Sequence, residues 1–129
     1  MGNLKEKIDL ATEKANAKTL TIEEAEKLVA EFPVSDQANA LLGFVHFQQE
    51  NYSEAINALV HSLKFGKSLA AWNVLGKCYQ QIVEFPKAIE SYEQALKINS
   101  QDSQTLYNLA LVYGLQGKFD FSEKIFKKL

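Results

Sequence analysis

The chain has 129 residues, with 14 basic and 16 acidic side chains and a formal net charge of −2. Its hydrophobic residues (47%) and charged residues (23%) occur in the proportions of a soluble globular domain that can bury one sizeable core. The charges form no block of one sign, which excludes the clustered basic face typical of nucleic-acid-binding proteins, and no apolar stretch is long enough to span a bilayer. We therefore predict no nucleic-acid partner and no membrane insertion.

The N-terminal residues are charged and contain too few apolar side chains for a secretory signal peptide. Cys78 is the single cysteine, which rules out an internal disulfide and favours a reducing compartment. These features predict a cytoplasmic location.

The first 35 residues predict two helices. Residues 4–17 form a polar, moderately periodic helix. Thr21 follows as a helix N-cap, with Glu23 and Glu24 in the first turn of the second helix and Pro33 beyond its end.

Six further helices are predicted from apolar residues at helical spacing. In the clearest one, Trp72, Leu75 and Tyr79 fall at i, i+3 and i+7 and form one stripe. Pro86 suits the first turn of the following helix, where its missing N–H costs nothing. The alternation of apolar and polar residues typical of a strand is sustained nowhere, so the predicted fold class is all-α. The expected helices span residues 36–49, 53–65, 69–82, 86–98, 103–116 and 119–128.

These helices recur in pairs at an interval of 33 or 34 residues. Gly76 has counterparts in Gly43 and Ala110, and small residues recur in the same way at the start of each second helix. Such small residues let two antiparallel helices approach closely. The gaps between the pairs are expected to be filled by four large side chains: Trp72, Tyr79, Tyr92 and Phe126.

The middle unit resembles the signature of the tetratricopeptide repeat (TPR) family. The signature is carried by Trp72-x-x-Leu75-Gly76-x-x-Tyr79 and then Ala88-x-x-x-Tyr92-x-x-Ala95. It departs from the family at Ser100, where proline is favoured. The resemblance implies an antiparallel helix-pair solenoid, the TPR superhelix, of about three repeats with an N-terminal capping helix pair. The corresponding segments are the cap at 1–35 and the repeats at 36–68, 69–102 and 103–129, of which the last is truncated.

In such an array the first helix of each pair lines the concave side, and the residues between its core positions face the groove. Amide side chains can pair with both the N–H and the C=O of an extended backbone, and aromatic rings can cover a side chain. The sequence therefore predicts a groove that binds a peptide or a helix of a partner protein. The alternative is a solvated helix face, with Phe44 and Phe47 serving as packing between units. The groove residues are Gln37, Phe44, Phe47 and Gln48 from the first repeat; Asn73, Lys77, Gln80 and Gln81 from the second; and Gln104, Tyr107, Asn108 and Leu111 from the third.

The carboxylate clamp of TPR proteins that bind acidic chaperone tails is not predicted. Asn108 matches its middle element, but Asn73-x-x-x-Lys77 reverses its first element. The third inner helix has no Lys or Arg to supply the last element. Lys77 alone remains a candidate contact for a carboxylate or a backbone carbonyl.

No catalytic constellation is visible, so we predict that the protein is not an enzyme and has neither a cofactor nor a metal. His46 and His61 fall on different helices, without the Cys, His or carboxylate partners of a metal site. Cys78 lies beside core positions and is expected to be an inert buried thiol.

The C-terminal end of the sequence is unusually apolar. Phe119, Phe121, Ile125, Phe126 and Leu129 are expected to stay partly exposed, which indicates either a fragment of a longer protein or a surface for self-association. The leading prediction is thus a non-enzymatic protein-interaction module that binds its partner in the concave groove. The alternative is a self-association or assembly domain of a larger protein or complex, with a homodimer formed through this apolar end.

Overall fold

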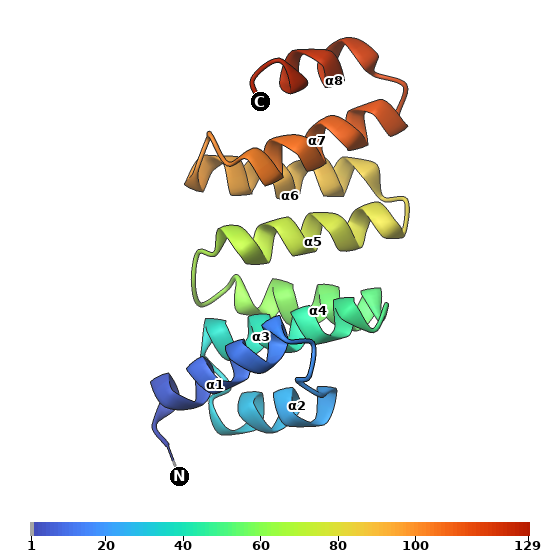
Figure 1. Ribbon diagram of the computed structural model, residues 1–129. Coiled ribbons are helices and arrows are strands. Elements are labelled where there is room, and N and C mark those ends of the chain that lie inside the picture. Colours follow the sequence, from blue (N-terminus) through green and yellow to red (C-terminus); the bar gives the residue numbers. More distant parts are fainter. Residues whose placement is uncertain (1) are drawn as a thin grey trace. The chain divides into compact units, whose positions relative to one another are not determined.

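The structure, a computed structural model, describes residues 2–129 and shows eight α-helices and no strand in that range (Figure 1). The predicted all-α fold class is confirmed. Every predicted helix is present, and its observed ends lie within three residues of the predicted ones. The helices form two compact units, the first ending at Lys67 and the second running from Ser68 to Leu129.

The first unit is built around α3 (Asp36–Gln48), which contacts the three other helices of the unit. These are α1 (Leu4–Asn16), α2 (Ile22–Glu31) and α4 (Tyr52–Ser62). Helix α4 packs along α3 as a close antiparallel pair, whereas α1 and α2 each pack on α3 and hardly on each other. The core between α1, α2 and α3 consists of Ile8, Ala11, Ala15, Leu20, Ala25, Leu28, Ala38, Leu41 and Val45.

The second unit consists of two close helix pairs, in which α5 (Leu69–Gln81) packs on α6 (Phe85–Ile98) and α7 (Ser103–Leu115) packs on α8 (Phe119–Phe126). Helix α7 also packs on α6 and touches α5, so the two pairs share one core. Its buried residues are Ala88, Tyr92, Leu106, Leu109, Ala110, Val112 and Ile125.

Side chains cap the first helix of each pair. Ser35, Ser68 and Asp102 accept a hydrogen bond from a backbone N–H in the first turn of α3, α5 and α7. At the start of α2, Thr21 and Glu24 form a complete capping box, as the predicted N-cap and its acidic first turn suggested.

Helices α4, α6 and α8 are the second helices of the three closely packed pairs, and among residues 2–129 they have no side-chain cap and begin after the same kind of tight turn. Each turn contains one residue with positive φ: Glu50 (63°), Val83 (65°) and Gly117 (77°). The backbone N–H that follows reaches back to the end of the preceding helix, as in Glu84 N to Tyr79 O at 2.8 Å. This is the hydrogen bond of a Schellman motif, which ends a helix with a left-handed residue.

The small residues lie where the paired helices meet, as predicted. A Cβ on Gly43 would come within 2.6 Å of Leu59 Cγ, and one on Gly76 would overlap the ring of Tyr92. Only Tyr92 of the four predicted gap-filling side chains is fully buried. Trp72 and Tyr79 are partly buried, and Phe126 is 41% exposed because, among the described residues, no helix covers this side of α8.

Candidate functional site

The groove residues predicted on α5 and α7 lie on two neighbouring helices of the second unit. A buried hydrogen bond joins the helices directly, from Asn73 Nδ2 to Thr105 Oγ1 at 2.7 Å. The Thr105 hydroxyl in turn donates to Asp102 Oδ2 at 2.6 Å. These hydrogen bonds, together with the one from the Thr105 backbone N–H, hold the pKa of the Asp102 carboxyl below its usual range. The N-cap of α7 therefore also fixes the side chain of Asn73 on α5.

Two asparagine side chains at this site keep an unused hydrogen-bonding atom. Asn73 Nδ2 donates to Thr105, and Asn73 Oδ1 has no hydrogen-bond partner among residues 2–129. Asn108 Oδ1 accepts a hydrogen bond from Gln104 Nε2 at 3.0 Å, and Asn108 Nδ2 has no partner in the same range. Both residues are more than nine-tenths buried, Asn73 being 7% and Asn108 6% exposed. The site thus holds one free acceptor and one free donor, although buried amide atoms are normally paired.

The side chains around these asparagines are exposed or half-buried. Gln81, Gln104, Tyr107 and Leu111 are exposed, with Tyr107 at 46% and Leu111 at 37%. The ring of Tyr107 makes an edge contact with Phe126 of α8, with a centroid distance of 6.0 Å. Helix α7 therefore exposes two large side chains, Tyr107 and Leu111, on either side of the buried Asn108 in the sequence.

Lys77 and Gln80 are the half-buried members of the set on α5. Gln80 Oε1 accepts a hydrogen bond from the Tyr92 hydroxyl at 2.9 Å, so its position is fixed from the core. Lys77 forms no ion pair with any carboxylate in the range that the structure describes. It is the one charged residue among the predicted groove side chains.

The groove residues predicted from the first repeat lie in the first unit, where three of them have internal partners. Phe44 packs against the core of that unit, and the Phe47 ring lies 5.9 Å from that of Tyr52. Gln48 Nε2 donates to the backbone oxygen of Ala15 at 3.4 Å. Such contacts match the packing role that the sequence left open, and membership of a groove stays a prediction for these residues.

The histidines, the cysteine and the carboxylates outside the predicted groove are scattered over the described residues. Among residues 2–129, no three His, Cys, Asp or Glu side chains lie close enough together to hold a metal ion. His46 faces Asn51 and His61 faces Asn39, each through its Nδ1. Cys78 is buried, and burial raises the pKa of its thiol to about 12, so it is protonated at neutral pH. Within the same range no helix combines the length and apolarity that a membrane crossing requires.

Two family models match this chain. The TPR repeat model matches residues 84–117, and a second model, described as anaphase-promoting complex, cyclosome, subunit 3, matches residues 22–95, more than half of the chain. The chain belongs to the TPR family. The predicted family is thus confirmed.

Two relatives match parts of the chain, and one of them is described as a TPR repeat-containing protein. A TPR repeat-containing protein of Methanocaldococcus jannaschii is 31% identical over 78 residues, which are 60% of this chain and 14% of that protein. The general transcriptional corepressor trfA of Dictyostelium discoideum is 28% identical over 97 residues, which are 73% of this chain and 7% of that protein. The chain therefore matches only a small part of the length of these curated relatives.

The crystal structures of MamA share the fold. One has a TM-score of 0.87 and 27% sequence identity, and the match covers 98% of this chain and 75% of that one. A second has a TM-score of 0.86 and 28% identity, covering 98% and 70% of the two chains. TPR repeats typically form non-enzymatic interaction modules, and the chain is in general terms a protein–protein interaction scaffold.

Asn73, Asn108 and Gln104, which bonds to Asn108, were all among the predicted groove residues, but the two side chains that hold Asn73 were not. Asp102 and Thr105 were not among the predicted groove residues, although an Asp followed three residues later by Thr at a helix start is a recognisable capping signal. The contact of Thr105 with α5 depends on how α5 and α7 pack together. The sequence pattern gives no information on that packing.

Proposed function

We propose that this TPR chain is a non-enzymatic scaffold whose second unit binds an extended peptide segment along α5 and α7. The observation that carries the proposal is the pair of buried amide atoms without partners, the acceptor Asn73 Oδ1 and the donor Asn108 Nδ2. An extended backbone offers one N–H and one C=O per residue, which are the complementary groups. A small movement of the exposed Gln104 side chain would open Asn108 to such a ligand.

The side chains around the two amides define which peptide would fit. Tyr107 and Leu111 are exposed on α7 and provide an apolar contact surface, and Lys77 on α5 offers an unpaired positive charge. The ligand of the proposed groove is therefore an extended segment with an apolar side chain and a carboxylate or carbonyl group near Lys77.

The experiment is a selection from a displayed random-peptide library, followed by calorimetry with the best synthetic peptide. Asn108→Ala is expected to weaken binding about fivefold to tenfold, the equivalent of one lost hydrogen bond of roughly 1–1.5 kcal/mol. Lys77→Ala is expected to weaken it less, and Glu90→Ala, an exposed change on α6, should leave it unchanged. Methylation of the backbone nitrogens of the peptide should abolish binding. Equal affinity of the parent and Asn108→Ala for an unmethylated peptide would reject the groove.

A second candidate function, self-association, is favoured by the apolar surface of α8. Phe119 is 70% exposed, Phe121 55%, Phe126 41% and Leu129 51%. A cluster of this kind on a soluble protein typically marks an interaction surface. Light scattering over a dilution series should then show a dimer that Phe126→Glu abolishes and that Ile98→Glu, a change at a side chain 45% exposed on α6, leaves intact. A monomer at every concentration would exclude this function.

We also infer that the repeats run over residues 36–68, 69–102 and 103–129, with residues 1–35 as the cap. The three positive-φ turns support this division, because Glu50, Val83 and Gly117 follow one another at 33 and 34 residues. A cytoplasmic location is part of the proposal and rests on the single cysteine, Cys78, which allows no internal disulfide.

A further inference from the structure

Helices α1 and α2, which hardly pack on each other, leave an open groove between them. The groove has a volume of about 350 Å³ and is lined by one stripe of each helix and by Leu20 of the connecting turn. Because ligand pockets in proteins range from about 300 to 1,000 Å³, this space suits one or two side chains and not a whole helix.

The floor of this α1–α2 groove is apolar. Leu20 and Leu28 are buried at its base, with exposures of 6% and 8%. Leu10 projects from α1 along the same groove and is 57% exposed. A large apolar side chain exposed beside buried ones provides a contact surface that the first unit itself does not use.

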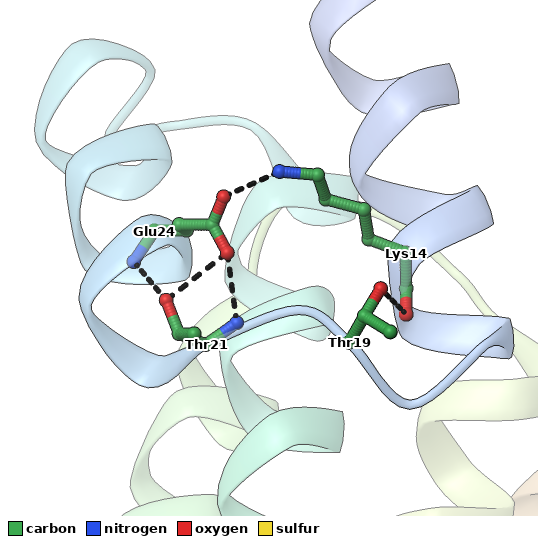
Figure 2. A network of polar contacts seen from close by, with 4 residues as sticks. All are labelled: Lys14, Thr19, Thr21 and Glu24. Atoms are coloured by element: carbon green, nitrogen blue, oxygen red, sulfur yellow. Dashed lines mark hydrogen bonds and ion pairs between the residues drawn. The ribbon is translucent and has the colours of Figure 1, made fainter.

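Two ion pairs cross the groove from α1 to α2. Lys7 Nζ lies 2.6 Å from Glu31 Oε1, and Lys14 Nζ lies 2.5 Å from Glu24 Oε2; Figure 2 shows the second pair with the capping box of Thr21. The partners are seven residues apart on each helix, so the pairs stand at opposite ends of the groove. Leu10 on α1 lies between them.

Lys27 is the charged residue of the groove that takes part in neither ion pair. It lines the groove on α2 between the two glutamates, whose carboxylates are both engaged by lysines of α1. No ion pair that includes Lys27 occurs in the part of the chain that the structure describes. The charged lining therefore consists of three lysines and two glutamates, and Lys27 is the lysine that stands outside the two ion pairs.

We propose that the α1–α2 groove is a second docking site, for an acidic segment of a partner protein. One large apolar side chain of the segment lies against Leu10 and Leu28, and a neighbouring carboxylate pairs with Lys27. Charge complementarity selects this occupant, since a basic segment would meet Lys27 with like charge. The site is separate from the groove of α5 and α7, which belongs to the other unit.

The test uses two synthetic probes, acetyl-Glu-Leu-Leu-Glu-amide and its control acetyl-Lys-Leu-Leu-Lys-amide, titrated into the full chain and followed by two-dimensional NMR. We expect the acidic probe to shift backbone amide signals of α1, α2 and the turn between them, and the basic probe to shift none. Raising the salt concentration should weaken binding, because Lys27 is exposed to solvent.

Three variants complete the test. Lys27→Glu should weaken binding of the acidic probe about fivefold or more, as expected for a partly exposed ion pair, and Leu10→Ala should weaken it to a similar extent. Lys64→Glu makes the same charge change on the first unit outside the groove and should bind like the parent. Absence of shifts up to the solubility limit, shifts on α5 and α7 instead, or equal binding by Lys27→Glu and Lys64→Glu would each overturn the proposal.

Discussion

The helices of the α5–α6 pair and of the α1–α2 pair are each joined by a short turn, but the two pairs are held together in different ways. In α5–α6, Gly76 receives the ring of Tyr92, and the two helices pack along their length. In α1–α2 the facing positions carry long side chains such as Lys14 and Glu24, which meet at their charged ends and leave space below. The two pairs therefore differ in the side chains that meet between their helices, which are a glycine and a buried ring in one and long charged side chains in the other.

The largest difference in stability between the two pairs is expected when one side chain of each pair is truncated to alanine. Tyr92 is fully buried, so Tyr92→Ala should lower the free energy of unfolding by about 3–5 kcal/mol. Leu10 is 57% exposed in the open α1–α2 pair, so Leu10→Ala should change the free energy of unfolding by no more than about 0.5 kcal/mol. Urea unfolding followed by circular dichroism measures both. Similar losses in the two variants would mean that α1–α2 is as closed as α5–α6.

A smaller effect is expected from adding one methyl group at a helix contact. Gly76→Ala should destabilise the chain by about 1–3 kcal/mol, because its Cβ would overlap the buried Tyr92 ring. Gly114 in α7 is the matched control, since a Cβ there would lie 3.7 Å from Ser122 Oγ, an ordinary contact. Gly114→Ala should gain about 0.5–1 kcal/mol from its better helix propensity. Thermal melts of the two variants should therefore move in opposite directions.

The turns of the two pairs should also respond differently to glycine. Val83, between α5 and α6, has φ of 65° and is 68% exposed, so Val83→Gly relieves strain and sacrifices little packing. We expect a gain of about 0.5–1 kcal/mol in the free energy of unfolding. Lys18, between α1 and α2, has φ of 60° but no branched Cβ, and Lys18→Gly should gain less. Gly117→Val serves as the reverse change, and a stabilised Gly117→Val would contradict the strain at these turns.

The smallest expected effect is a dependence of stability on pH. It should distinguish the α1–α2 pair, which is joined by ion pairs, from the closely packed α5–α6 pair. The hydrogen bond from Lys14, followed by those from Thr21, lowers the pKa of the Glu24 carboxyl from 4.5 to about 2. Because the folded-state value is the lower one, Glu24 contributes stability above pH 4.5, and this contribution is lost as the pH falls towards 2. The difference in melting temperature between the parent and Glu24→Gln should shrink over that interval. A constant difference would show that the ion pair does not link α1 to α2.

Local patterns were sufficient to predict the helices and the close packing of α3 with α4, of α5 with α6 and of α7 with α8. Thr21, Pro86 and the recurrent small residues each act on neighbours within a few positions or at a fixed interval, so their effects can be read along the chain. The burial of Tyr92 beside Gly76 follows from the same pattern.

Features that depend on tertiary packing were beyond that pattern. The hydrogen bond from Asn73 to Thr105 spans 32 residues, and nothing local distinguishes Thr105 from an ordinary capping residue. The α1–α2 groove was missed because helix periodicity shows which face is apolar but not how far two helices stand apart. Trp72 was expected in the core but is only partly buried, although it belongs to the same helical stripe as the buried Leu75.

The hydrogen bonds from Asn73 through Thr105 to Asp102 also have a consequence for evolution by duplication and exchange of repeats. Thirty-four residues after Asn73 stands Tyr107, which carries no amide, so the units are not interchangeable despite their common plan. Suppose that another helix followed α6 and carried no hydroxyl in the place of Thr105. The buried amide of Asn73 would then lose its hydrogen bond, and the free energy of unfolding would fall by about 1–3 kcal/mol. The hydrogen bond from Asn73 to Thr105 therefore restricts which helix can follow α6 without loss of stability.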